Sequence, residues 1–281
     1  MTSFSQNFCA ILFEMIATFI LTYTWLSTHA APISMALALW FCGLMGGRVS
    51  GSHLNPAVTL AFMIRSSPYN LNFCLGLFFW LFQLIGAFIA GILFWLSTGE
   101  KHFGATMTKD EWFGTIFIEI MGTFGVTAII LMNTEAETKL AHEDWVVYLL
   151  IGISLGLATY WAKGGVNTTS PAVFNPAIGV GTVLASIVLG GDNSRMVSMF
   201  WVFIAFPAIG AVLALFFHQC IYKNAVTGGH QKEHLLDWST PSFSSNYKDT
   251  PYNPHSFSHF QFNIHLTSHS YLWPSLSTPL T

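Results

Sequence analysis

The chain reads SGSHLNPAVT at residues 50–59 and AVFNPAI at residues 172–178, so the tripeptide Asn-Pro-Ala occurs twice. Each copy follows a stretch rich in Gly, Ser and Thr and begins an apolar run that is too short to cross a membrane alone. Asparagine can cap the free amides at a helix start, proline is tolerated at the first helical position, and alanine allows another segment to approach closely. Each copy therefore predicts the start of a short helix.

A second repeat supports the first. The segment FEMIATF at residues 13–19 matches IEIMGTF at residues 118–124, which aligns Glu14 with Glu119 at an offset of 105 (119 minus 14). The offset between the two Asn-Pro-Ala copies is 120 (175 minus 55), so the second half has longer loops. Because three predicted spans separate equivalent points, the two halves must lie upside down relative to each other in a membrane. Each half then contributes one half-helix, and the two enter from opposite faces.

The composition of the 281-residue chain is that of a membrane protein, since 53% of the residues are hydrophobic and only 8% are charged. A membrane helix needs about 20 apolar residues. Suitable runs predict six spans, at residues 8–27, 33–47, 73–96, 112–132, 145–161 and 196–221. The first run carries Glu14 and lacks a basic flank, so we expect it to remain as a span. We predict an all-α membrane protein with six transmembrane helices plus two re-entrant half-helices in an inverted repeat.

The predicted organisation is one membrane domain over residues 1–225, with inverted repeats at about 1–110 and 111–225, and a polar tail over residues 226–281. The tail is rich in Ser, Pro and His and has no helical or strand period, which predicts disorder. An even number of spans puts both termini on one side, and the excess of Lys and Arg on that side favours cytoplasmic termini. A formal net charge of -3 shows no basic excess, so no nucleic-acid partner is expected.

The two half-helices also predict a function. If they meet tip to tip in the middle of the membrane, their positive dipole ends point at one spot, where Asn55 and Asn175 can offer amide donors. A water oxygen can accept both hydrogen bonds, whereas a cation or proton is repelled. This arrangement predicts a narrow pore for water or small uncharged solutes. The expected pore motif residues are Asn55, Pro56, Ala57, Asn175, Pro176 and Ala177.

The chain resembles the aquaporin, or major intrinsic protein, superfamily over roughly residues 8–222. Residues 50–59 are similar to the family's first signature, and residues 175–177 are its second. The resemblance implies an hourglass fold and homotetramers in which every protomer holds its own pore. The surroundings would be a lipid bilayer, either the plasma membrane or an internal vacuolar or vesicular membrane. No cofactor or metal site is predicted, because the four cysteines lie in apolar runs and the histidines of the tail are scattered.

Two acidic residues, Glu14 and Glu119, fall inside predicted spans, where a carboxylate is costly unless it is hydrogen-bonded. Intramembrane acids suggest proton relays or ion sites, but duplication in the repeat favours a structural role. In similar proteins these glutamates brace the backbone of the re-entrant loops, and the resemblance gives His53 a part in holding the first loop. Small residues spaced four apart, such as Gly86 and Ala90, predict closely packed helices.

The predicted selectivity filter departs from the family pattern. Family members that pass water or glycerol usually carry Arg directly after the second Asn-Pro-Ala, where this chain has Ile178. Counting back from the two asparagines, as in similar proteins, gives Met35 and Ala172 as filter residues. The fifth helix contributes either Thr159, which the local pattern favours, or Lys163, which an ungapped count gives. The favoured ring has few donors and predicts a permissive pore, with glycerol, urea, ammonia and hydrogen peroxide as candidate permeants besides water.

Two other membrane functions remain open. A secondary transporter also uses inverted repeats and broken helices around a midplane site, and Glu14 and Glu119 are the deep acids that could couple it. A structural or junctional membrane protein with a closed pore would explain the missing filter arginine. An enzyme is not expected, because the sequence has no HExxH, GxSxG, P-loop or dinucleotide fingerprint. Asn167, in the sequon Asn-Thr-Thr, is a candidate glycosylation site on the non-cytoplasmic side.

Overall fold

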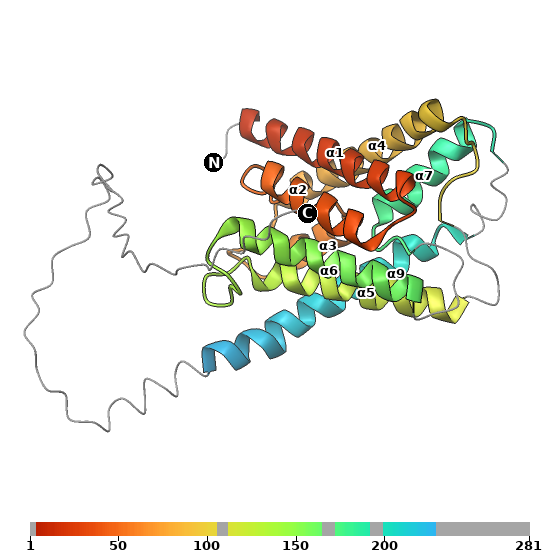
Figure 1. Cartoon of the computed structure of the whole chain (residues 1–281). Helices are drawn as coiled ribbons and strands as arrows, with labels where there is room; N and C mark the ends of the chain where they lie inside the picture. Colours follow the sequence, from red (N-terminus) through yellow and green to blue (C-terminus); the bar gives the residue numbers. More distant parts are fainter. Residues whose placement is uncertain (1–3, 106–111, 165–171, 192–198, 229–281) are drawn as a thin grey trace, which may run out of the picture. The chain divides into compact units, whose positions relative to one another are not determined.

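The computed structural model describes residues 4–105, 112–164, 172–191 and 199–228, and the regular structure within these ranges is entirely helical (Figure 1). The helices in chain order are α1 (Phe4–Ser27), α2 (Pro32–Gly46), α3 (Pro56–Ile64), α4 (Phe73–Thr98), α5 (Trp112–Met132), α6 (Asp144–Gly164), α7 (Pro176–Val188), α9 (Val202–Phe216) and the π-helix η2 (Phe217–Tyr222).

Most of the predicted spans correspond to long apolar helices. Those long enough to cross a membrane are α1, α4, α5, α6 and the segment Val202–Gly228, which contains α9 and η2. Helix α2 is equally apolar, but its 15 residues cover only about 22 Å, less than the roughly 30 Å of a hydrocarbon core. The prediction of an all-α membrane protein is confirmed.

Equivalent helices of the two halves pack in the same way. In the first half α1 packs along α4, and in the second half α5 packs along α9. Helices α2 and α6 pack along each other and join the halves. Each half-helix also contacts a long helix of the other half, α3 against α9 and α7 against α4. This exchange ties the two halves together around α3 and α7, as an inverted repeat with re-entrant helices requires.

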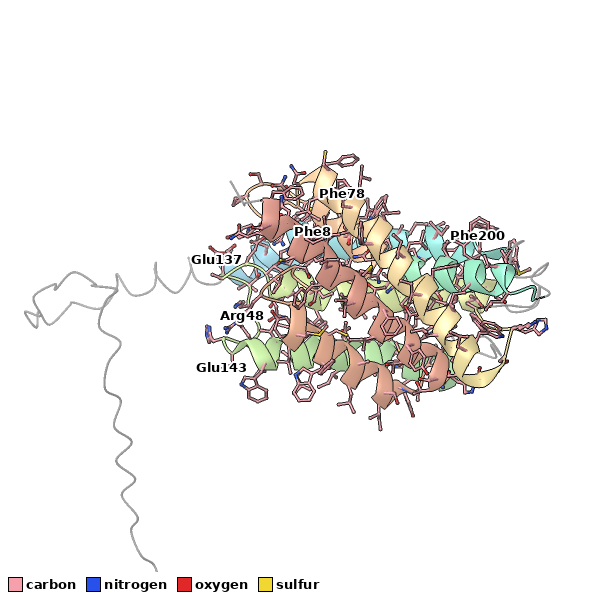
Figure 2. The ribbon with its side chains drawn as sticks, turned by 90° about the horizontal axis from the view of Figure 1, so that it is seen from above. Phe8, Arg48, Phe78, Glu137, Glu143 and Phe200 are labelled. Carbon is pink, nitrogen blue, oxygen red and sulfur yellow. The ribbon has the colours of Figure 1, made fainter. Side chains whose placement is uncertain are left out.

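Large apolar side chains cover the outside of the helices. Phe8 of α1 and Phe78 of α4, which are 49% and 52% exposed, lie on the outside of the helices (Figure 2). The charged residues Arg48, Glu137 and Glu143 instead lie at one end of the helices (Figure 2). An apolar belt with charges confined to the helix ends is the surface expected of a protein surrounded by lipid.

Glycines allow the closest helix crossings. A Cβ atom on Gly86 of α4 would overlap the backbone carbonyl of Met15 in α1, and a Cβ atom on Gly210 of α9 would overlap that of Ile120 in α5. Met15 and Ile120 are equivalent in the repeat, so both halves use the same crossing. Small residues at these points let the backbones approach closely, which is how many membrane helices gain packing energy.

We expect Gly86→Ala to lower the free energy of unfolding by about 1–3 kcal/mol, because the added methyl group can only displace backbone. Gly125→Ala in α5 is the matched control. A Cβ atom at Gly125 meets nothing within 4 Å, and alanine favours the helix. Thermal unfolding of the detergent-purified protein measures both changes. Equal melting temperatures for the two variants would contradict this packing assignment.

The last helix runs past the boundary that the sequence predicts for the membrane domain. Residues 223–228 continue the helix after η2, so the chain is still helical at residue 226, where the predicted tail begins. The rest of the predicted tail, residues 229–281, lies outside the described residues. The helical part of the chain therefore extends to at least Gly228.

Candidate functional site

Two asparagines cap the two half-helices in the same way. Asn55 precedes α3 and Asn175 precedes α7, both with extended backbone (φ −153° and −149°). The side-chain oxygen of each asparagine accepts a hydrogen bond from the amide of the alanine two residues further on, at 2.9 Å in both copies. The intervening proline has no amide that needs a partner. Each Asn-Pro-Ala therefore satisfies its own helix start.

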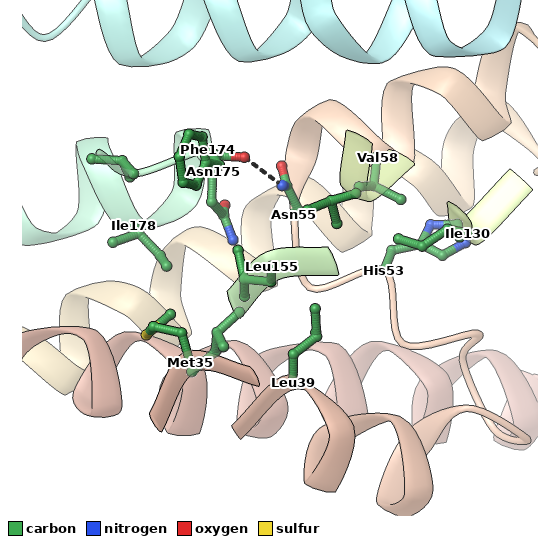
Figure 3. Close-up of a pocket in the computed structure, with 13 residues that line it drawn as sticks. Met35, Leu39, His53, Asn55, Val58, Ile130, Leu155, Phe174, Asn175 and Ile178 are labelled. Carbon is green, nitrogen blue, oxygen red and sulfur yellow. Dashed lines mark hydrogen bonds between the residues drawn. The ribbon is translucent and has the colours of Figure 1, made fainter. Parts of the chain in front are cut away.

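The two capped ends face each other and are joined by a crossed pair of hydrogen bonds. Asn55 Nδ2 donates to the carbonyl of Phe174, and Asn175 Nδ2 donates to the carbonyl of Leu54, each at 2.7 Å. Figure 3 shows α3 and α7 leaving this point in opposite directions. An amide nitrogen carries two N–H groups, so each asparagine keeps one N–H for a molecule beside the pair. Both positive helix ends also point there.

The accepting carbonyls belong to strained backbone. Leu54 and Phe174 have φ angles of 53° and 55°, in the left-handed region that non-glycine residues rarely adopt. Such a conformation costs about 1–3 kcal/mol and persists only where its surroundings hold it. The repeat places a buried glutamate behind each of these two residues.

Glu14 and Glu119 are fully buried and accept hydrogen bonds from the re-entrant loops. Glu14 accepts from the amides of His53 and Leu54, at 2.9 and 2.7 Å. Glu119 accepts from the two amides directly before Asn175, at 2.7 and 2.8 Å. Each carboxylate thus fixes the two peptide groups that precede its asparagine, which is the geometry that loop bracing needs.

The first loop has further support that sequence reasoning missed. Glu14 also accepts from the hydroxyl of Ser50 at 2.6 Å and from the side-chain amide of Gln83 at 2.7 Å. Gln83 donates in addition to the hydroxyl of Thr59 at 3.1 Å, which links α4 to α3. Gln83 is fully buried in an otherwise apolar helix. A lone glutamine inside an apolar span was the signal that could have identified it.

His53 is bonded to Glu14 through its backbone, while its imidazole takes another place. The ring packs between Phe62 and Phe79, with centroid distances of 4.5 and 5.7 Å. Its Nδ1 has no hydrogen-bond partner in the described protein. The side chain instead lines a cavity beside the asparagine pair.

This cavity is narrow and mostly apolar. Among the described residues that line it, the polar side chains are His53, Asn55 and Asn175, and none is acidic. The cavity has a volume of about 20 Å³, measured by the centre of a water-sized sphere. On this measure one water molecule needs about 10–15 Å³. In this conformation the cavity suits molecules that pass one at a time.

Two of the four predicted filter residues line the cavity. Met35 and Ile178, each 1% exposed, lie at the end of the cavity opposite His53 (Figure 3). Thr159 is buried outside the cavity lining, and its hydroxyl lies within hydrogen-bonding distance of two carbonyls of its own helix, at 2.9 and 3.0 Å. The residue that α6 contributes to the lining is Leu155, one turn earlier.

The other filter candidates lie elsewhere. Ala172 is buried outside the cavity lining, and its carbonyl accepts a hydrogen bond from the indole of Trp25 at 3.2 Å. Lys163 is exposed. Residues 165–171, which include the sequon asparagine Asn167, lie outside the described residues. In this conformation the aliphatic side chains leave little open space, and the permissive pore expected from the sequence stays a prediction.

A buried ion cluster holds the far end of α3. Arg65, which ends α3, has a side chain with 0% exposure and pairs with Glu135, which is 1% exposed and follows α5. Lys223 pairs with Glu135 at 2.6 Å, and Arg65 donates to the hydroxyl of Thr134 at 2.7 Å. Burial raises the pKa of the Glu135 carboxyl, but hydrogen bonds and charges from Lys223 and Arg65 lower it by more, so this pKa lies below its ordinary value.

The chain has two inverted halves, and their capped half-helices meet at one narrow cavity. This arrangement defines a multi-pass membrane protein of the pore-forming class. Residues 27–218, more than half of the chain, match the family described as Major intrinsic protein. The chain belongs to the major intrinsic protein family and is an integral membrane protein. The family consists of channels rather than enzymes.

Relatives from plants and one solved structure extend this finding. The chain is 29% identical over 196 residues to the probable aquaporin TIP1-2 of Oryza sativa subsp. japonica, covering 69% of this chain and 71% of that protein. It is 31% identical over 200 residues to a probable aquaporin TIP-type of Antirrhinum majus, covering 70% and 73%. The X-ray structure of the aquaglyceroporin from Plasmodium falciparum has the same fold, with a TM-score of 0.67, 18% identity and coverage of 79% of this chain and 99% of that chain.

Proposed function

We propose that this protein is a passive channel for water and small uncharged solutes. The observation that carries the proposal is the asparagine pair, whose amides belong to opposed half-helices and present one free N–H each to a single narrow cavity. A water oxygen can accept from both amides, and the aliphatic walls on either side do not hold it back. The relatives named above are aquaporins, which supports the same function for this chain.

The same geometry opposes the passage of ions. The positive ends of α3 and α7 point into the cavity, and the described lining residues include no acid to offset them. A cation would have to give up its hydration shell against aliphatic side chains. Cation exclusion therefore does not require an arginine in place of Ile178.

The candidate solutes can be ranked by their size. Ammonia and hydrogen peroxide are close to water in width and suit a cavity of about 20 Å³. Glycerol and urea are wider, and each carries several donors that would lose their partners along the aliphatic wall. We infer that water passes most readily and that glycerol and urea pass poorly.

A coupled carrier is less well supported by this site. Glu14 and Glu119 do not line the cavity, and their oxygens are occupied by donors from the re-entrant loops. A carrier would need one of these acids to face the substrate. No contact in the described part of the chain gives them that role.

We further propose that the Asn-Pro-Ala residues line the pore, that Glu14 and Glu119 brace the loops, and that the channel works as a homotetramer with one pore in each protomer. The family resemblance supports the tetramer. We also propose cytoplasmic termini, which the excess of Lys and Arg on that side supports. The proposed location is the plasma membrane or an internal vacuolar or vesicular membrane. The crossed hydrogen bonds and the paired carboxylates support the assigned residue roles.

Proteoliposomes that contain the protein are expected to shrink at least about tenfold faster than empty vesicles in stopped-flow osmotic assays. Asn175→Asp should remove most of this flux. Aspartate keeps the oxygen that caps α7, but it replaces the donor to the Leu54 carbonyl with a second oxygen. Asn72→Asp is the matched control, because Asn72 also caps a helix, α4, away from the cavity. Parent flux no greater than that of empty vesicles would refute the channel.

A further inference from the structure

We propose that Leu155 is the residue of α6 that sets the size limit of the pore, in the place where the family pattern points to Thr159 or Lys163. The inference rests on the proposed channel function. It concerns which solutes pass, and not whether water passes.

Leu155 belongs to an aliphatic constriction next to the asparagine pair. Met35, Leu155 and Ile178 come from α2, α6 and α7, line the same cavity and are 1%, 6% and 1% exposed. Figure 3 shows Leu155 beside the amide of Asn175, and Met35 and Ile178 on the side of the pair away from His53. Their side chains offer no donor and at most the weak acceptor of a thioether. A solute moving to or from Asn175 therefore passes between three apolar groups.

The two alternative residues of α6 do not reach this constriction. The Thr159 hydroxyl lies against the carbonyls of Leu155 and Gly156 of its own helix, at 3.0 and 2.9 Å, so its single O–H donor is already used. Lys163 is exposed. Neither belongs to the cavity lining, so α6 presents neither a donor nor a charge to a passing solute there.

The packing of α6 fixes Leu155 in place. Gly152 lies one turn before Leu155, and a Cβ atom on it would overlap the carbonyl of Ala36 in α2. A Cβ atom on Gly156 would lie 2.8 Å from the Ala36 Cβ and 3.0 Å from the carbonyl of Pro32. Because α6 is pressed against the α2 backbone on both sides of Leu155, the leucine cannot withdraw by a shift of its helix. A wider solute needs a smaller side chain.

Removing side-chain volume at Leu155 tests this assignment. In proteoliposomes, we expect glycerol and urea uptake by the parent to stay close to that of empty vesicles, and Leu155→Ala to raise both at least about fivefold. Water permeability, normalised to reconstituted protein, should stay well above that of empty vesicles, because the asparagine pair is untouched. Leu157→Ala is the control. Leu157 lies on the same helix, is 45% exposed and is absent from the cavity lining, so its truncation should leave every flux at the parent level.

Two additional variants keep the test decisive. Leu155→Val removes less volume and should give a smaller rise in urea uptake, which covers the case in which the alanine variant does not reconstitute. Thr159→Val should leave solute uptake unchanged. Unchanged glycerol and urea uptake in the Leu155 variants, together with normal water flux, would overturn the assignment, as would a rise in Thr159→Val alone. A parent without excess water flux would instead refute the proposed channel itself.

Discussion

Glu14→Gln is expected to remove most of the water permeability and to lower the free energy of unfolding by about 2–4 kcal/mol. The Glu14 carboxylate accepts four hydrogen bonds, two from loop amides and two from the side chains of Ser50 and Gln83. A glutamine side chain can accept at only one oxygen, and its NH2 group would face two donors. The left-handed Leu54 would then lose part of the contact that holds its carbonyl toward Asn175.

Water flux at matched membrane abundance and thermal unfolding in detergent measure this effect. The double variant Glu14→Gln with Gln83→Glu provides the control, since it returns a carboxylate to the same buried cluster. We expect the pair of changes to be milder than the sum of the two single changes, because the two side chains contact each other at 2.7 Å. Strictly additive losses would show that Glu14 does not act through this hydrogen-bond cluster.

The sequence carried enough information to predict the fold and the meeting of the two half-helix ends. The duplicated Asn-Pro-Ala and the repeated glutamates are local patterns that a sequence displays. Because the two halves are inverted, these patterns predict two half-helices that enter the membrane from opposite faces. The helical architecture confirms the all-α membrane fold that they predicted. Capping of α3 by Asn55 likewise depends on residues two positions apart, which a sequence displays directly.

Residues that act through long-range contacts could not be predicted in the same way. Gln83 meets Glu14 across 69 positions of sequence, and a single apolar helix gives no indication of which neighbour its glutamine will face. Leu155, which lines the cavity, was missed for a different reason. The candidates on α6 came from a local pattern, which gave Thr159, and from an ungapped count, which gave Lys163, but the part of α6 that reaches the cavity is decided by how α6 packs on α2. The basic residues, with Arg65 and Lys223 among them, entered the prediction only through the charge bias that favours cytoplasmic termini, although the Arg65 side chain is fully buried.

Glu135→Gln is expected to lower the free energy of unfolding by about 3–5 kcal/mol, because it leaves the buried guanidinium of Arg65 without its anion. Lys223 is 34% exposed and can turn toward solvent, so most of the loss should come from Arg65. The remaining bond from Arg65 to Thr134 is neutral at the acceptor and cannot replace the carboxylate. Because Arg65 ends α3, whose other end is capped by Asn55, we also expect lower water permeability at matched abundance.

The pH dependence of stability separates this charge effect from a simple packing defect. The pKa of Glu135 is lower in the folded protein than its ordinary value, so the carboxylate stabilises the fold above the unfolded pKa, and this stabilisation is lost as the pH falls through the folded pKa. The parent should therefore lose stability below about pH 4, and Glu135→Gln should lack that part of the loss. Glu137→Gln is the matched control, since Glu137 is exposed and lies two residues away. If Glu135→Gln and the parent lose stability in parallel below that pH, the cluster does not stabilise the protein through the Glu135 charge.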